Sequence, residues 1–152
     1  MGQSVRLLVL LVFVATVAGC ATTSGPTGPS NPLIGAWQVN SVRTNGVGKN
    51  LITFSSDGTF FRSGDTHPVL SGAHGAWQQS ADGEFQATYI AFRFDENRKW
   101  VGSNKTLLRI KLGPGPHQFT GTARAIIRDL EEKQLGIGEA RLEGRRIEVE
   151  SQ

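Results

Sequence analysis

The stretch Leu33-Ile34-Gly35-Ala36-Trp37-Gln38-Val39 decides the fold. It is predicted to be the first ordered strand of the chain, and it carries a Gly-x-Trp whose large indole ring requires a buried slot. The segments that follow it are short candidate strands separated by turn signals. The sequence therefore predicts a domain over residues 33–152 that wraps the ring of Trp37.

The composition favours a single turn-rich, all-β domain. The chain has 152 residues, and its 19 Gly and 6 Pro are spread over the whole length. The 16 basic and 13 acidic residues give a net charge of +3, and the basic ones are scattered singly apart from Arg145-Arg146. This scatter is typical of a solvated surface and argues against a nucleic-acid partner, despite a pI near 9.4. Because Cys20 is the single cysteine, an intrachain disulfide is excluded.

Residues 1–19 have the features of a secretory signal peptide. A single charge at Arg6 precedes the apolar run 7–15, which is too short to span a membrane. The leader ends in Val17-Ala18-Gly19-Cys20, which resembles the lipobox of bacterial lipoproteins. The resemblance implies cleavage before Cys20, lipid on its sulfur and acylation of the new amino terminus. The alternative is a buried Cys20 thiol beside an uncleaved anchor.

Lipidation of Cys20 would hold the mature protein at a membrane, because several acyl chains together exceed what stable attachment requires. The rest of residues 20–32 is dominated by Gly, Pro, Ser and Thr, which predicts a disordered tether. Ala21 occupies the position where an Asp is associated with inner-membrane retention of bacterial lipoproteins. The resemblance therefore implies a lipid-anchored protein of the cell envelope, on the periplasmic face of the outer membrane in a Gram-negative host.

Turn signals divide the chain after Leu33 into about nine candidate strands. Asp57-Gly58 predicts a two-residue hairpin that places Ile52 and Phe54 on the same face as Phe61. Glu143-Gly144 predicts another hairpin, which groups on one face Leu142, Arg145, Ile147 and Val149. An up-and-down antiparallel barrel of 8–9 strands is the expected architecture, since closure removes both sheet edges; a two-sheet sandwich is the alternative.

Alternation of residue types predicts which side chains face the interior. For the candidate strand at 119–127 the predicted inner face is Phe119, Gly121, Ala123, Ala125 and Ile127, and for the next strand it is Gly138, Ala140 and Leu142. In the segment 84–94 the alternation does not decide between two sets, Tyr89 with Ala91 and Ile90 with Phe92 and Phe94.

The first strand with Gly35 and Trp37, the meander that follows it and the last strand with Arg145 resemble the calycin group, especially lipocalin-like domains. The resemblance implies that Trp37 closes one end of the barrel and that a basic residue of the last strand packs across its ring. Arg145 is assigned to this role because it shares a predicted face with Ile147 and Val149. A guanidinium over an indole is stabilised by a cation–π interaction.

The small residues on the two predicted inner faces leave the barrel interior open to two interpretations. Larger side chains from the opposite wall either fill the volume or leave a cavity for one small ligand. In the second case an apolar ligand such as a fatty acid, a lipid fragment or an isoprenoid is expected, with the irregular stretch 64–74 as a lid. The predicted cavity residues are Phe54, Phe61, Trp77, Tyr89, Phe92, Asn104, Thr106, Leu108, Ala123 and Ala125.

No cofactor, metal site or catalytic residue is predicted. His67 and His74, with Asp65 nearby, could be interpreted as a metal site, but the two histidines are seven positions apart and no third ligand is defined. No nucleophile motif is present, and Cys20 is assigned to lipid. The leading hypothesis is a membrane-tethered binder of a small apolar molecule. The alternative is a structural lipoprotein with a filled barrel that contacts another envelope protein, and a barrel enzyme acting on a lipid-like substrate is the third possibility.

Overall fold

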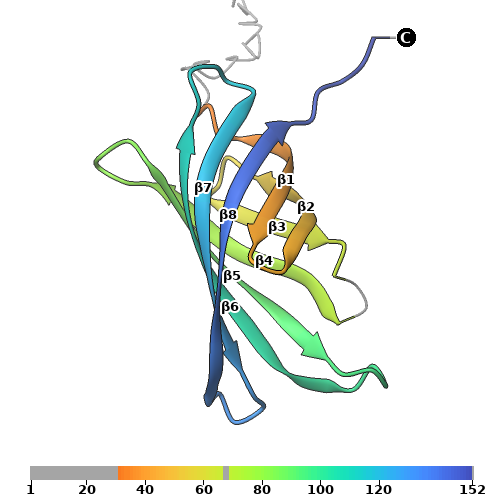
Figure 1. The fold of residues 1–152 in the computed structure, drawn as a ribbon. Helices are drawn as coiled ribbons and strands as arrows, with labels where there is room; N and C mark the ends of the chain where they lie inside the picture. The colour runs from red at the N-terminus through yellow and green to blue at the C-terminus, as the bar shows by residue number, and fades with distance from the viewer. Residues whose placement is uncertain (1–30, 67–68, 152) are drawn as a thin grey trace, which may run out of the picture.

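The computed structural model describes residues 31–66 and 69–151, and these residues form a closed antiparallel barrel of eight strands (Figure 1). Each strand pairs with the next one along the chain, and β8 pairs with β1 to close the barrel. This confirms the predicted up-and-down barrel over the alternative of a sandwich. The strands are β1 (Gly35–Arg43), β2 (Gly46–Phe54), β3 (Thr59–Gly64), β4 (Leu70–Gln79), β5 (Phe85–Phe94), β6 (Trp100–Leu112), β7 (Gln118–Arg128) and β8 (Gln134–Arg146).

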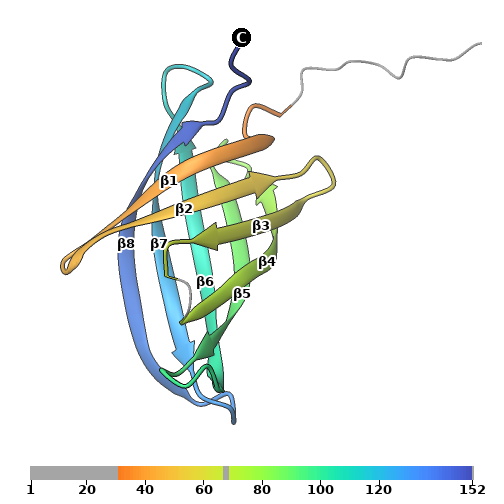
Figure 2. The ribbon, with the colours of Figure 1, turned by 90° about the vertical axis from the view of Figure 1, so that its right-hand side faces the viewer.

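The barrel wall is taller on one side than on the other. β6 and β8 have 13 residues each, whereas β3 has 6. Figures 1 and 2 show the β5–β6 and β7–β8 hairpins extending beyond β1, β2 and β3 at the end of the barrel away from the marked C-terminus, which we call the far end. Trp37 pairs with Arg146 at the C-terminal end of β8 and therefore lies at the opposite end. Residues 31–66 and 69–151 contain no helix that is long and apolar enough to cross a membrane.

Trp37 lies fully buried at the other end of the barrel. Its ring packs against that of Phe119 at a centroid separation of 4.9 Å, and its Nε1 donates a hydrogen bond of 2.9 Å to the Leu33 carbonyl. The guanidinium carbon of Arg146 lies 4.3 Å from the centroid of the indole. Arg146 also donates to the carbonyls of Ile34, at 2.8 Å, and of Pro116, at 2.9 Å. The assignment of Arg145 to the indole was therefore wrong, and Arg146 takes that place.

The predicted hairpin at Glu143-Gly144 was wrong, and this explains the misassigned arginine. β8 continues through Gly144 without a turn, so the alternation that places Leu142 inside also places Arg146 inside and leaves Arg145 exposed. Gly144 is required for a different reason than a turn. A β-carbon at this position would overlap the ring of Phe119, which packs directly over the glycine. The unbroken β8 is also why the barrel has eight strands where about nine were expected.

Gly35 makes room for the same guanidinium. It has a φ of +130°, which side chains disfavour, and a β-carbon there would lie 2.6 Å from Nη1 of Arg146. The Gly-x-Trp stretch therefore supplies both the ring on which the guanidinium lies and the gap through which it reaches the Ile34 carbonyl.

The hairpin between β2 and β3 contains one residue more than predicted. Ser55 and Thr59 bracket the three residues 56–58, with Gly58 at a φ of +83°, as in a three-residue turn with a bulge. The extra residue shifts the alternation, so that Phe54 pairs with Phe60 and both are buried. Phe61 is 42% exposed on the outer surface, where its ring meets that of His74. The placement of Phe61 inside the barrel was therefore wrong.

On β5 the structure decides between the two alternations that the sequence left open. Tyr89 and Ala91 face the interior, and Phe92, which is 54% exposed, lies outside against Trp100. The placement of Phe92 in the cavity was therefore wrong. The apolar core fills the half of the barrel that contains Trp37, and its largest fully buried members are Trp37, Phe54, Phe60, Phe85, Phe119, Leu33, Ile110 and Val39.

Candidate functional site

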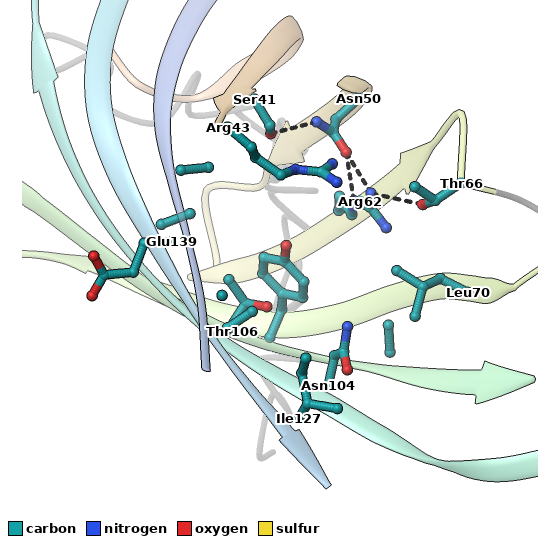
Figure 3. Close-up of a pocket in the computed structure, with 16 residues that line it drawn as sticks. Ser41, Arg43, Asn50, Arg62, Thr66, Leu70, Asn104, Thr106, Ile127 and Glu139 are labelled. Carbon is teal, nitrogen blue, oxygen red and sulfur yellow. Dashed lines mark hydrogen bonds between the residues drawn. The ribbon is translucent and has the colours of Figure 1, made fainter. Parts of the chain in front are cut away.

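A cavity of about 200 Å³ occupies the far half of the barrel (Figure 3). Its walls differ in chemistry. Strands β1, β2 and β3 supply polar side chains, and the turn after β3 adds Thr66. The opposite wall is mostly small and apolar. The polar members are Ser41, Arg43, Asn50, Arg62 and Thr66; the apolar ones are Leu70, Ala91, Ala123, Ala125, Ile127, Gly138 and Ala140; Tyr89, Asn104 and Thr106 complete the interior lining.

The small wall is produced by facing residues of β7 and β8. Ala123 pairs with Ala140, and Ala125 pairs with Gly138, so four adjacent inward positions together supply only three methyl groups. A filled barrel requires larger side chains at such positions, because protein interiors pack to nearly crystalline density. The predicted inner faces of these two strands are confirmed, and the cavity lies against them.

Asn50 organises the polar wall. Its Nδ2 donates to Ser41 Oγ at 2.8 Å, which fixes the amide so that Oδ1 points to Arg62. Oδ1 accepts hydrogen bonds from Arg62 Nε at 2.8 Å and from Nη2 at 2.5 Å, and Nη2 also donates to Thr66 Oγ1 at 3.3 Å. All three residues of the network Ser41–Asn50–Arg62 are buried, and Arg62 is only 8% exposed. The network holds the Arg62 guanidinium inside the barrel.

No acidic side chain balances this guanidinium among the residues that the structure describes. The ion pairs found there are His117 with Glu148 and Arg128 with Glu132, both away from the cavity. Glu139 contributes to the lining, but its side chain is exposed and points away from the interior (Figure 3). Arg62 is thus a buried cation whose hydrogen-bond partners, Asn50 and Thr66, are neutral.

Asn104, on β6, is a second incompletely satisfied group. Its side chain lines the cavity, and its Oδ1 is buried without a hydrogen-bond partner among the described residues. Buried polar atoms are almost always paired with protein, water or ligand. The orphan oxygen therefore leaves an acceptor in the cavity wall for a water molecule or for a polar group of a ligand.

The structure brings together some of the sequence-predicted cavity residues and separates the others. Five of them line the cavity: Tyr89, Asn104, Thr106, Ala123 and Ala125. Phe54 and Leu108 are buried in the core, and Trp77 packs beside that core with Nε1 donating to the Ser55 carbonyl. Phe61 and Phe92 lie on the outer surface, as described above.

Sequence reasoning missed the polar wall. Apart from Arg145, the basic residues were interpreted as solvated, and the few polar groups expected in the cavity came from β5 and β6. The signal that could have found the wall is the series Asn50, Ile52 and Phe54, because a polar residue in step with two apolar ones on a strand shares their buried face. The stretch 64–74 is not a long lid, since β4 begins at Leu70.

The lining combines hydrogen-bonding groups with apolar surface, which suits the binding of a small molecule. Among the lining residues that the structure describes, no carboxylate or imidazole points into the cavity to act as a general base. No group of three or more His, Cys, Asp or Glu side chains that could hold a metal occurs in residues 31–66 and 69–151. Cys20 and the predicted signal peptide, along with most of the predicted tether, lie outside the described residues.

No protein-family model, curated protein or solved structure matches this chain. The closed eight-stranded antiparallel barrel is compatible with a lipocalin-like fold.

Proposed function

We propose that this chain is a membrane-tethered lipoprotein of the cell envelope whose lipocalin-like barrel binds a small molecule, apolar over most of its surface, in the far-half cavity. The observation that carries the proposal is the volume of about 200 Å³ left by the small wall of β7 and β8. An engineered apolar cavity of about 150 Å³ in another protein binds benzene, whereas drug-sized ligands occupy roughly 300–1,000 Å³. A long acyl chain therefore exceeds the enclosed volume, and any longer ligand would extend through the far end.

Filling the cavity is expected to abolish binding. Ala125 faces the interior opposite Gly138, so Ala125→Phe places a ring in the space that the ligand would use. Native mass spectrometry of protein extracted without delipidation should find a small molecule on the wild type and none on this variant. Overpacking is expected to reduce the free energy of unfolding by about 1–3 kcal/mol, which a folded barrel tolerates.

The matched control for this experiment is Thr122→Phe on the same strand. Thr122 is exposed on the outer surface, so the added ring leaves the cavity unchanged and the ligand should be retained. A wild-type protein that carries and accepts no small molecule, or an Ala125→Phe variant that binds as the wild type does, would contradict the proposed function.

The proposal of a lipid anchor is based on Val17-Ala18-Gly19-Cys20 and on the short apolar run before it. Cys20→Ser is expected to abolish incorporation of radiolabelled palmitate in cells, because the serine hydroxyl does not replace the sulfur to which the lipid is attached. Ser24→Ala, four residues further along the proposed tether, is the control and should be labelled like the wild type. Equal labelling of the Cys20→Ser protein would rule out this anchor. If the anchor is present, the proposed address is the periplasmic face of the outer membrane.

A second candidate function, contact with another envelope protein, is supported by the outer surface. Ile90, Phe92 and Trp100 are each about half exposed on β5 and β6, and the rings of Phe92 and Trp100 meet edge to face at 5.9 Å. Clustered exposed apolar residues often mark protein contacts. Phe92→Ser should abolish a cross-link to a partner in intact cells and leave ligand binding unchanged. An identical cross-linking pattern in wild type and variant would argue against this function.

A further inference from the structure

The polar wall indicates the chemical class of the ligand, because some hydrogen-bond donors of Arg62 have no protein acceptor. A guanidinium has five N–H groups. The Nε group and the two on Nη2 are engaged by Asn50 and Thr66. The two N–H groups on Nη1 have no hydrogen-bond acceptor among the described residues, and Nη1 is not one of the fully buried unpartnered atoms, so it reaches accessible space although the side chain is only 8% exposed. Water can satisfy these donors, whereas an anion would satisfy them and also supply the counter-charge that the buried cation lacks.

The position of this guanidinium is built into the backbone. It lies directly over Gly64 of β3, where a β-carbon would overlap Nη2 and would lie 2.7 Å from Asn50 Oδ1. The glycine and the chain of hydrogen bonds from Ser41 through Asn50 therefore preorganise Arg62 before any ligand arrives. Because Nε and Nη2 already donate to Asn50 and Thr66, a carboxylate would accept from Nη1 through a charge-assisted hydrogen bond, which is shorter and stronger than a neutral one.

A second cation lies on the same wall. Arg43, at the end of β1, lines the cavity and lies over Gly48. The Asp65 carboxylate also approaches Gly48, but it accepts a hydrogen bond from the Lys49 backbone and forms no ion pair with Arg43. Arg43 is exposed and has the Asp65 carboxylate nearby, so it adds less to the attraction of an anion than the buried Arg62 does.

We propose that the cavity takes a small carboxylic acid in its ionised form, with the carboxylate on Arg62 and the apolar body against Ala123, Ala125 and Gly138. This inference rests on the proposed function, because it names the ligand class of the same cavity. Scaling from benzene in a cavity of about 150 Å³, the 200 Å³ found here encloses about eight non-hydrogen atoms, which is the size of hexanoate. The unpaired Asn104 Oδ1 provides an acceptor for a hydroxyl or amine on that body.

The test compares hexanoate with hexan-1-ol by isothermal titration calorimetry on the full chain at pH 8 and low ionic strength. The two probes share a chain and differ in the head group, so their difference reports the carboxylate interaction. Hexanoate is expected to bind at least about tenfold more tightly, as a charge-assisted hydrogen bond in a buried site predicts. Equal affinities, or tighter binding of the alcohol, would overturn the inference and leave the proposed function standing. Binding of neither probe would instead count against the proposed function.

Arg62→Met identifies the residue responsible. It keeps the length and apolar stem of the side chain and removes the charge, so the affinity for hexanoate should fall at least about tenfold while that for hexan-1-ol is kept. Arg109→Met removes one positive charge from the exposed outer surface of β6 and should change neither affinity. Equal weakening by the two substitutions would show that only net charge matters. If Arg62→Met does not fold, Arg62→Gln removes the charge and keeps a polar group, and an undiminished preference for hexanoate over hexan-1-ol would then overturn the placement of the carboxylate on Arg62.

Discussion

Replacing Trp37 with alanine is expected to lower the free energy of unfolding by about 3–5 kcal/mol, as measured by chemical denaturation. The side chain is fully buried, it packs on Phe119, and no neighbouring element can collapse into the space without breaking the strand pairing around it. Trp100→Ala is the matched control. This indole is half exposed on the outer surface, and its loss should cost less than about 1 kcal/mol. Equal losses would mean that Trp37 does not close the barrel.

The contribution of the guanidinium can be separated from that of the ring by a double-mutant cycle. Trp37 and Arg146 are direct neighbours across β1 and β8, so their coupling energy should be about 0.5–2 kcal/mol. Arg145, one position earlier and exposed, should show none. A coupling found with Arg145 instead would show that β8 is out of register by one residue.

The barrel architecture could be predicted from the sequence because its signals are local. Short strands, frequent turn residues and the absence of a helical period point to one closed sheet, and each of these is readable without knowing any distant contact. The count of strands was less secure. Gly58 really does lie in a turn, whereas Gly144 lies within a strand beneath an aromatic ring. The sequence alone does not distinguish these two uses of glycine, because the ring that requires Gly144 comes from a different strand.

The candidate site was only half predictable, and the omission of Arg62 follows from a single error. The small wall on β7 and β8 was found because side-chain volume can be summed along a strand. Arg62 was missed because a two-residue turn was expected at Gly58, and that turn places Phe61 inside and Arg62 outside. The three-residue turn that forms reverses both faces. One residue in a loop thus decides whether the interior is apolar or carries a buried cation.

The register of β3 that this three-residue turn sets gives the second large expected effect on stability. Phe60→Ala is expected to lower the free energy of unfolding by about 3–5 kcal/mol, because the ring is fully buried between Phe54 and Tyr89, each at a centroid separation of 5.2 Å. Phe61→Ala, its immediate neighbour and control, should cost less than about 1 kcal/mol, since that ring is 42% exposed. Urea denaturation of the two variants measures both values.

The comparison of Phe60 with Phe61 reaches beyond stability. Side chains alternate along β3, so the face that buries Phe60 also buries Arg62, two residues later. Phe60 also supports the cavity directly, because it stacks on Tyr89, which lines it. If Phe61→Ala proved the more damaging change, β3 would be turned over and Arg62 would point to solvent. The cavity would then lose its buried cation, and a carboxylate would have no reason to be preferred over an alcohol.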